Sequence, residues 1–247
     1  MIRYERSKGL TDVHTHYCPG CTHGILHKLV AEVLEELNLL GQTVGLASVG
    51  CSVFSYDYIN TDFQQVPHGR ACATATGIKR VLPDRVVFTY QGDGDFASIG
   101  IAEAIHAANR GENITAIVAN NATYGMTGGQ MAPTTLLGQV STTSQQGRNI
   151  EMHGSPIHIS EIFSQIQGAA YVERVSLHDI PNIRKAKKAI KKAFTYQLEK
   201  KGFTMIEVVS TCPINWKMKP KEAMDWARDH MLPVYPLGVY KDVASHD

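Results

Sequence analysis

The chain has 247 residues, a length that suits one large α/β domain with a complete hydrophobic core. It is 43% hydrophobic and has a formal net charge of +1, which excludes a disordered chain and gives no electrostatic basis for binding nucleic acid or a membrane. No apolar run approaches the roughly 18 residues of a membrane span, and residues 1–6 lack the apolar core of a signal peptide, so we expect a cytoplasmic protein.

The first third of the chain begins with a polar lead-in over residues 1–17. Leucine and valine at helical spacing predict a helix over 25–40, with Gly41 as its stop. Residues 54–66 show no clear period and are expected to form a loop. The other elements predicted here are a strand over 43–49 and a helix of small residues over 71–78.

The rest of the chain alternates strands and helices. Strands are predicted over 85–90, 114–119, 171–175 and 203–209, and helices over 98–108, 159–166 and 183–198. The polar, Gly-rich segment 124–155 is expected to be a functional loop, and the tail after Ile214 is expected to wrap a partner. The pattern predicts an open, mostly parallel sheet with helices on both faces, formed by residues 1–247 as a single domain.

Two polar segments follow neighbouring predicted strands. Gly92, Asp93, Gly94 and Asp95 come after the strand 85–90, and Asn121 comes after the strand 114–119. If these strands are parallel neighbours, the side chains converge on the edge where open α/β sheets bind ligands. A carboxylate, an amide oxygen and a backbone carbonyl suit Mg²⁺ that holds a diphosphate, and glycine allows close backbone approach. The competing interpretation is a tight Gly-Asp-Gly turn without a ligand.

Four cysteines map to the same edge. Cys18 and Cys21 form a Cys-Pro-Gly-Cys turn, whereas Cys51 and Cys212 follow predicted strands. Converging thiolates suit a 4Fe–4S cluster or a tetrahedral zinc, and the spacing alone leaves both open, together with unlinked core cysteines. The neighbouring histidines that favour zinc are His14, His16 and His23. The fifth cysteine, Cys72, is expected in the core.

The predicted helix near the C-terminal third is strongly basic. Residues 184–201 contain eight lysines and arginines and one acidic residue, Glu199. This face is either a docking surface for an acidic electron carrier or another subunit, or an ordinary solvated helix face, and the second interpretation is favoured.

The Gly-Asp-Gly segment, followed by Asn-Asn after one helix and one strand, resembles the thiamine diphosphate motif. The resemblance implies that Asp93, Asn121 and the carbonyl of Thr123 bind Mg²⁺. It also implies that the pyrophosphate lies against the loop from Gly92 to Asp95.

A longer series of motifs occurs in order along the chain. It comprises Cys-Pro-Gly-Cys, Gly-Cys-Ser, His-Gly-Arg-Ala, Gly-Asp-Gly-Asp, Asn-Asn-x-x-Tyr-Gly-Met-Thr-Gly-Gly-Gln and a late Thr-Cys-Pro. Over residues 12–215 the chain therefore resembles the β subunit of a 2-oxoacid:ferredoxin oxidoreductase, with the thiamine diphosphate-binding fold. The resemblance implies a 4Fe–4S cluster on the four cysteines Cys18, Cys21, Cys51 and Cys212. It further implies that Ser52 and His68 contact the cofactor and that Gly125, Met126 and Thr127 line the phosphates and substrate pocket.

The activity implied by this resemblance is oxidative decarboxylation of a 2-oxoacid with coenzyme A, with electrons passed through the cluster to ferredoxin. In that family a separate α subunit supplies the pyrimidine-binding domain and the activating glutamate, so we assign no catalytic residue in this chain. We expect that α subunit as an obligate partner, together with γ and ferredoxin-like subunits. No nucleic-acid or membrane partner is expected.

The substrate preference is indicated by one position. Members of the family that use 2-oxoglutarate commonly have a lysine just after the Tyr-Gly-x-Thr segment, where this chain has Gly128. The absence of a cation favours an apolar substrate such as 2-oxoisovalerate. The alternatives are 2-oxoglutarate or pyruvate as substrate, a non-oxidative thiamine diphosphate enzyme with a structural zinc, and a non-catalytic subunit with a zinc site.

Overall fold

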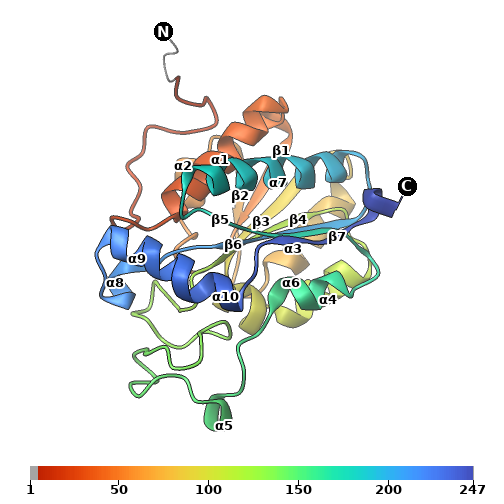
Figure 1. Ribbon diagram of the computed structural model, residues 1–247. Coiled ribbons are helices and arrows are strands. Elements are labelled where there is room, and N and C mark those ends of the chain that lie inside the picture. The colour runs from red at the N-terminus through yellow and green to blue at the C-terminus, as the bar shows by residue number, and fades with distance from the viewer. Residues whose placement is uncertain (1–4, 247) are drawn as a thin grey trace.

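The computed structural model describes residues 5–246, which contain one seven-stranded sheet in the order β2-β1-β3-β4-β6-β5-β7 (Figure 1). Neighbouring strands are parallel except for β7, which pairs antiparallel with β5. The strands are β1 (Thr43–Ala47), β2 (Asp62–Gln65), β3 (Val86–Gly92), β4 (Thr115–Asn120), β5 (Ala169–Ser176), β6 (Phe203–Val209) and β7 (Gly238–Asp242). The predicted fold class, an open and mostly parallel sheet, is confirmed.

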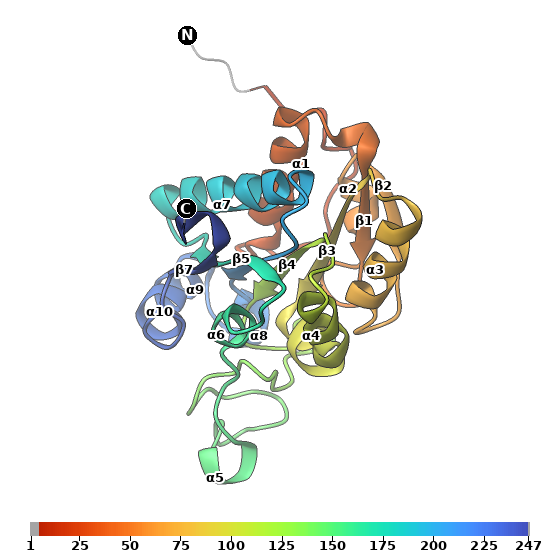
Figure 2. The same cartoon turned by 90° about the vertical axis from the view of Figure 1, so that its right-hand side faces the viewer.

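Helices cover both faces of the sheet, as Figures 1 and 2 show. One face packs against α1 (His23–Glu36) and α7 (Ile180–Leu198). The opposite face packs against α3 (Ala71–Val81), α4 (Ile101–Asn109) and α6 (Ile159–Ser164). Because both faces are buried, the central strands are continuous apolar runs instead of alternating ones, and every residue of β4 and β6 is buried.

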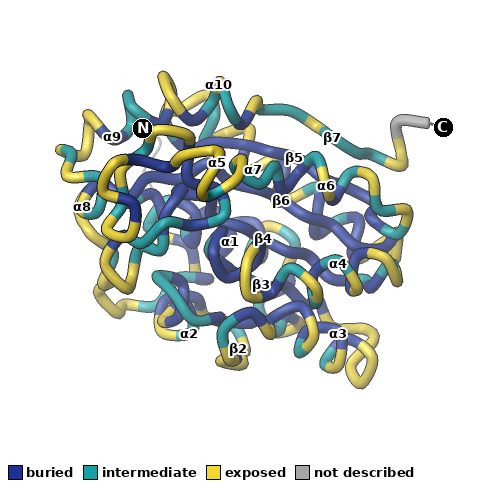
Figure 3. The backbone as a smooth tube through the Cα atoms, turned by 90° about the horizontal axis from the view of Figure 1, so that it is seen from below, coloured by how far each residue is buried: buried dark blue, intermediate teal, exposed yellow. Residues whose placement is uncertain are grey.

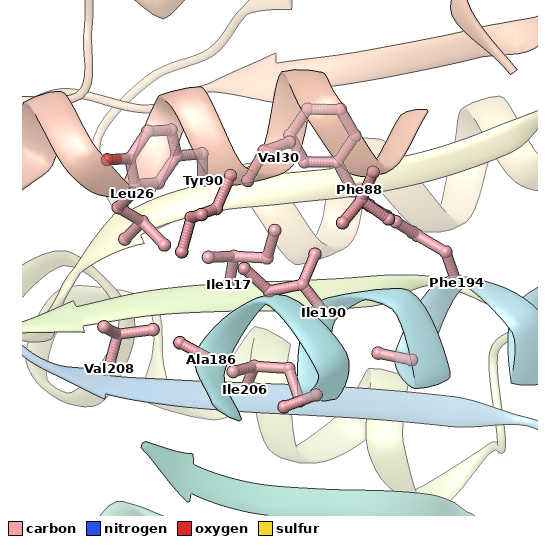
Figure 4. Close-up of a cluster of buried hydrophobic side chains, with 14 of the residues drawn as sticks. Leu26, Val30, Phe88, Tyr90, Ile117, Ala186, Ile190, Phe194, Ile206 and Val208 are labelled. Atoms are coloured by element: carbon pink, nitrogen blue, oxygen red, sulfur yellow. The ribbon is translucent and has the colours of Figure 1, made fainter. Parts of the chain in front are cut away.

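The core under α1 and α7 is built from large side chains of β3, β4 and β6 (Figure 4). Phe88 of β3 meets Phe194 of α7 edge to face, with ring centroids 5.8 Å apart. Aromatic pairs in this arrangement stabilise a fold by about 1 kcal/mol beyond their buried area. The parallel register of β3 with β4 ends at the pair Gly92 and Ala119, which brings the carboxyl ends of the two strands together.

The basic helix α7 makes ion pairs with acidic residues of this chain. Lys187 bonds Glu32 at 2.6 Å and Glu36 at 2.8 Å, both on α1, and Lys192 pairs with Asp242 of β7. These two lysines hold α7 against its neighbours through ion pairs. They therefore favour a structural role for the basic residues of this helix over a role as a docking surface.

Several local predictions were wrong. Residues 54–66 contain α2 (Ser55–Tyr58) and the edge strand β2, which was missed because it is short and largely exposed and lacks apolar alternation. Helix α1 ends at Glu36 because Asn38 takes a left-handed conformation with φ of 55°, so Gly41 is not its stop. The helix predicted over 98–108 begins instead as a π-helical turn, Asp95–Ile99, before α4.

The C-terminal tail, in which the sequence shows little periodicity, packs on its own chain, and its contact with a partner stays a prediction. It forms α8 (Pro213–Trp216), α9 (Pro220–Trp226), a π-helical turn at Ala227–Met231, α10 (Leu232–Val234) and β7. Trp216 and Trp226 stack with ring centroids 4.5 Å apart, and Met231 and Tyr235 are completely buried. The tail has little periodicity because its short helices bury only a few side chains each.

The long loop between β4 and α6 extends away from the sheet, with the short helix α5 (Ile150–His153) at its far end (Figures 1 and 2). Its tip is mostly exposed, whereas the base of the loop contains buried residues (Figure 3). We call residues 132–155 the arm. Within the described chain, no helix has the length and apolar character needed to cross a membrane.

Candidate cofactor and cluster site

The strand order reverses direction between β1 and β3, and a cleft opens at the carboxyl ends of these two strands. Open α/β sheets bind ligands at such a switch point, because the two loops leave in opposite directions and separate. The cleft measures about 500 Å³, including the space open to solvent. Its walls are formed by His23, Val49, Gly50, Cys51, His68, Gly92, Asp93, Gly94, Asp95, Asn121, Thr123, Tyr124, Gly125, Met126 and Thr127.

Asp93 is the buried carboxylate of this cleft. The backbone N–H of Gly94 donates to Oδ1 at 2.9 Å, and the Thr134 hydroxyl donates to Oδ2. Burial raises the pKa of Asp93 to about 7, although these hydrogen bonds act in the opposite direction. A divalent cation at this carboxylate would compensate for the desolvation, because it provides the positive charge that the buried oxygens lack. The donor set therefore fits Mg²⁺.

The turn after β4 presents Asn121 and Thr123 to the same cleft. Ala122 between them has a left-handed backbone with φ of 56°, and its N–H donates to Oδ1 of Asn120 at 3.1 Å. Oδ1 of Asn121 accepts the N–H of Thr123 at 3.2 Å. Since β3 and β4 are paired parallel, this turn lies beside Asp93, as the sequence predicted.

His68 and Asp95 form a pair at the edge of the cleft. Nδ1 of His68 hydrogen-bonds Oδ1 of Asp95, which also accepts the N–H of Gly69 at 2.6 Å. The other oxygen of Asp95 accepts the Gln91 amide. The carboxylate that we predicted to contact the cofactor is thus occupied by protein donors and orients the imidazole of His68.

Tyr124 is a cleft residue that the sequence interpretation did not assign. Its ring packs against Gly94, where a Cβ would lie only 2.3 Å from the ring, and its hydroxyl donates to the Gly94 carbonyl at 3.1 Å. This contact explains the glycine after Asp93. The tyrosine could have been found from its place in the Asn-Asn-x-x-Tyr-Gly motif.

The loop after Tyr124 forms the lip of the cleft. Met126 is about half exposed there, and the Thr127 hydroxyl donates to the side-chain carbonyl of Gln130 at 2.6 Å. Ser52 follows the lining residue Cys51 but does not itself line the cleft. Its hydroxyl is buried and has no hydrogen-bond partner among residues 5–246.

Two of the four predicted cluster cysteines flank Gly125. A Cβ on Gly125 would lie 3.2 Å from Sγ of Cys51 and 3.5 Å from Sγ of Cys212, so both sulfurs line the loop that also borders the cleft. The cysteines come from β1 and β6, on opposite sides of β3 and β4, and only the sheet order brings them together.

The thiols of the Cys18–Cys21 turn lie close enough to this pair to act electrostatically on Cys51 and Cys212. The N–H of Cys21 donates to the Cys18 carbonyl at 2.9 Å, and Cys18 is exposed. Burial raises the pKa of Cys21 and of Cys51 to about 12, and the other cysteines of the group add to the effect. Cys212 is buried and Cys21 and Cys51 are half-buried, and thiolates that repel one another suit a cationic iron core. In the described part of the chain, no three His, Cys, Asp or Glu side chains are grouped to hold one metal ion.

The histidines that favoured zinc are mostly engaged elsewhere. Nδ1 of His23 hydrogen-bonds the Tyr90 hydroxyl at 2.7 Å, and Nδ1 of His16 hydrogen-bonds the Tyr58 hydroxyl at 2.7 Å. Burial lowers the pKa of His23 to about 3, so this histidine is neutral. Cys72 is buried in α3 beside Gln91 and lies outside the group.

The comparisons with known proteins agree with this geometry. Residues 45–208 match the family model described as thiamine pyrophosphate enzyme, C-terminal TPP binding domain, and thiamine pyrophosphate is another name for thiamine diphosphate. The chain is 46% identical over 239 residues to the ketoisovalerate oxidoreductase subunit VorA of Methanothermobacter thermautotrophicus, covering 97% of this chain and 50% of the relative. It is 35% identical over 253 residues to the 2-oxoglutarate synthase subunit KorB of Methanocaldococcus jannaschii, covering 100% of this chain and 87% of the relative.

A solved structure is similar over nearly the whole chain. It is the 2-oxoglutarate:ferredoxin oxidoreductase from Magnetococcus marinus with 2-oxoglutarate, coenzyme A and succinyl-CoA bound, at a TM-score of 0.78 and 25% identity, covering 98% of this chain and 86% of that one. The sheet, the cleft and the family match define the class of thiamine diphosphate-binding domains. Within that class, the chain belongs to the thiamine diphosphate-binding (β) subunits of 2-oxoacid:ferredoxin oxidoreductases. It spans about half the length of the ketoisovalerate oxidoreductase relatives that it matches.

Proposed function

We propose that this chain is the cofactor-binding subunit of a cytoplasmic enzyme that converts a 2-oxoacid and coenzyme A into an acyl-CoA and carbon dioxide, with electrons passed through a 4Fe–4S cluster to ferredoxin. The observation that carries this proposal is that Gly125 borders the cleft and that a Cβ at this position would lie 3.2 Å from Sγ of Cys51 and 3.5 Å from Sγ of Cys212. A cofactor in the cleft and a cluster on the cysteines would share that wall, so electrons would have a short path between them.

The residues of the cleft bind and orient the cofactor in this proposal. Asp93, Asn121 and the Thr123 carbonyl hold Mg²⁺ against the diphosphate, an all-oxygen shell of the kind this ion prefers. His68, fixed by Asp95, directs its second ring nitrogen to the phosphates, and the buried Ser52 hydroxyl is a further donor. Thiamine diphosphate itself supplies the electron sink for decarboxylation.

The choice of a cluster over zinc is supported by the surroundings of the cysteines. Among the described residues, no three His, Cys, Asp or Glu side chains are grouped to hold one metal ion, which is unfavourable for a single zinc. The four cysteines come from the Cys18–Cys21 turn and the ends of β1 and β6, and such a spread suits a cube of four irons better than one small ion.

Of the residues that the structure describes, no glutamate lines the cleft, and we propose that a second domain supplies the activating glutamate. The similar proteins are named as subunits, which supports a multi-subunit assembly. We propose an α subunit with the pyrimidine-binding domain as the partner, together with γ and ferredoxin-like subunits.

For the substrate we propose a branched 2-oxoacid such as 2-oxoisovalerate. The chain is more similar to the ketoisovalerate relative, at 46% identity, than to the 2-oxoglutarate relative, at 35%. Gly128 places no cation at the lip of the cleft, and its φ of 108° favours glycine there. 2-Oxoglutarate is the second candidate, because relatives with that name align over the full length of this chain.

The test is analysis of the anaerobically purified complex with its partner subunits. After subtraction of the iron in other subunits, we expect about four irons per copy of this chain. We also expect thiamine diphosphate to bind only when Mg²⁺ is present, and we expect Asp93→Asn to abolish this binding. Asp84→Asn, an exposed carboxylate before β3, is the matched control and should bind normally. Zinc without iron would exclude the oxidoreductase, and cofactor binding that is unaffected by Asp93→Asn would exclude the magnesium site.

A further inference from the structure

Asn215 joins the two halves of the site through a single amide group. It lies on α8, three residues after Cys212. Its Nδ2 donates to Sγ of Cys212 at 3.1 Å and to the carbonyl of Gly125 at 2.8 Å. One partner is a proposed cluster ligand and the other lines the cofactor cleft, so this side chain bonds one residue from each part of the proposed site.

The orientation of Asn215 is fixed by its neighbours. Gly129, at φ of 86°, lies against the amide so closely that a Cβ there would be 2.9 Å from Cβ and 3.1 Å from Oδ1 of Asn215. The helix itself starts at Pro213, and the N–H of Trp216 donates to the Cys212 carbonyl at 2.9 Å. The amide therefore has little freedom to turn away from the sulfur.

A hydrogen-bond donor at this sulfur lowers the energy of negative charge on the sulfur. The side-chain N–H of Asn215 points its positive end at Sγ of Cys212, so it stabilises negative charge on that sulfur. The same physics applies to a cluster, since hydrogen bonds to cluster sulfurs help to set its reduction potential. One-electron reduction adds negative charge, which a donor stabilises more in the reduced state than in the oxidised state.

We propose that Asn215 is a positioning residue that raises the reduction potential of a 4Fe–4S cluster on Cys212 and links that potential to the cofactor loop at Gly125. This inference rests on the proposed function. It adds the idea that binding of the cofactor and reduction of the cluster are coupled through one shared donor. By linkage, a bound cofactor that shifts the potential must also bind more tightly to one redox state than to the other.

The test is a potentiometric titration of the assembled complex with dithionite, followed by EPR. Asn215→Leu keeps the size of the side chain but removes the donor. We expect the equilibrium constant for reduction of the cluster to decrease on the order of tenfold. For a one-electron couple this corresponds to a reduction potential lower by about 59 mV. Ile214→Ala, on the same helix and 61% exposed, should leave the potential unchanged. Clusters in other subunits serve as internal references.

The titration is repeated with Mg²⁺ and thiamine diphosphate added. We expect the cofactor to shift the potential in the wild-type complex and to shift it less in Asn215→Leu. An iron-loaded variant with the wild-type potential would overturn the inference while the proposed function stands. Iron loss in both Asn215→Leu and Asn215→Ala would overturn it in favour of a role in cluster assembly. A wild-type complex without iron would overturn both proposals.

Discussion

The side chain of Asn120 on β4 donates a hydrogen bond to Glu207 on β6 at 2.8 Å, and both side chains are completely buried. The oxygen of the same amide accepts the N–H of Ala122, the left-handed residue between Asn121 and Thr123. The turn that presents two of the proposed magnesium ligands is therefore anchored inside the sheet, and the interior of the fold determines the geometry at its edge.

This anchoring predicts an effect on metal affinity at a residue that does not contact the metal. Asn120→Ala removes the acceptor for the Ala122 N–H, so the turn loses its fixed conformation. We expect Mg²⁺ affinity in the presence of thiamine diphosphate to fall by about tenfold, in the range found for groups that orient metal ligands. Calorimetric titration of the complex measures it, and the exposed Asn109→Ala is the control. Equal affinities in both variants would contradict the prediction.

A second prediction concerns Arg148, which holds the base of the arm. Its guanidinium donates to six backbone carbonyls from both sides of that base, those of Ala132, Pro133, Thr135, His153, Gly154 and Ser155. Arg148→Met removes these bonds, each with a net contribution of about 1 kcal/mol. We expect faster hydrogen exchange throughout the arm and unchanged exchange in β4 and β6, measured by mass spectrometry. Arg228→Met, at an exposed position, is the control. If the arm exchanges hydrogen no faster in Arg148→Met than in Arg228→Met, Arg148 does not hold the base of the arm.

A third prediction is a pH dependence at the contact between α1 and α7. The hydrogen bond from Lys187 lowers the pKa of Glu36, and Lys191 adds to this. A lowered folded-state pKa gives stability that is present above the unfolded pKa of about 4.3 and is lost as the pH falls through the folded value. Lys187→Met should therefore lower the free energy of unfolding at pH 7 by roughly 0.5 kcal/mol, because both groups are partly exposed.

The measurement for this prediction is denaturant unfolding of the variant and the wild type at several pH values. The difference between them should shrink below about pH 4, where Glu36 becomes protonated. Lys188→Met, on the exposed side of α7, is the matched control. A difference that stays constant with pH would mean that Lys187 acts through packing alone.

The fourth prediction concerns substrate choice at Gly128. A Cβ there would meet no atom within 4 Å, so a long side chain has room, although the φ of 108° makes any substitution strained. Gly128→Lys should raise kcat/KM for 2-oxoglutarate relative to 2-oxoisovalerate by about tenfold, because a cation at the lip can pair with the distal carboxylate. Gly128→Met has the same strain and no charge. A similar change in both variants would assign the effect to the backbone.

The sequence predicted the central strands well because a parallel sheet that is buried on both faces requires continuous apolar runs. It failed at β2 and in the tail, where short elements bury few residues and their local pattern is weak. It placed Asp95 among the cofactor contacts, which stays a prediction, but it did not show that this carboxylate, which lines the cleft, also holds His68. Local motifs identify which residues are chemically special, but not which neighbour each one faces.

The residue types, and the strand ends at which they stand, could be read from the sequence: Asp93 after β3, Asn121 after β4 and the cysteines after β1 and β6. That Cys51 and Cys212 both lie next to Gly125, and that Asn215 bonds one of them, became visible in the folded chain. Strand order and helix packing arise from contacts between distant segments. A linear pattern of side chains records the periodicity of each segment, and the distances between segments appear only when the core closes.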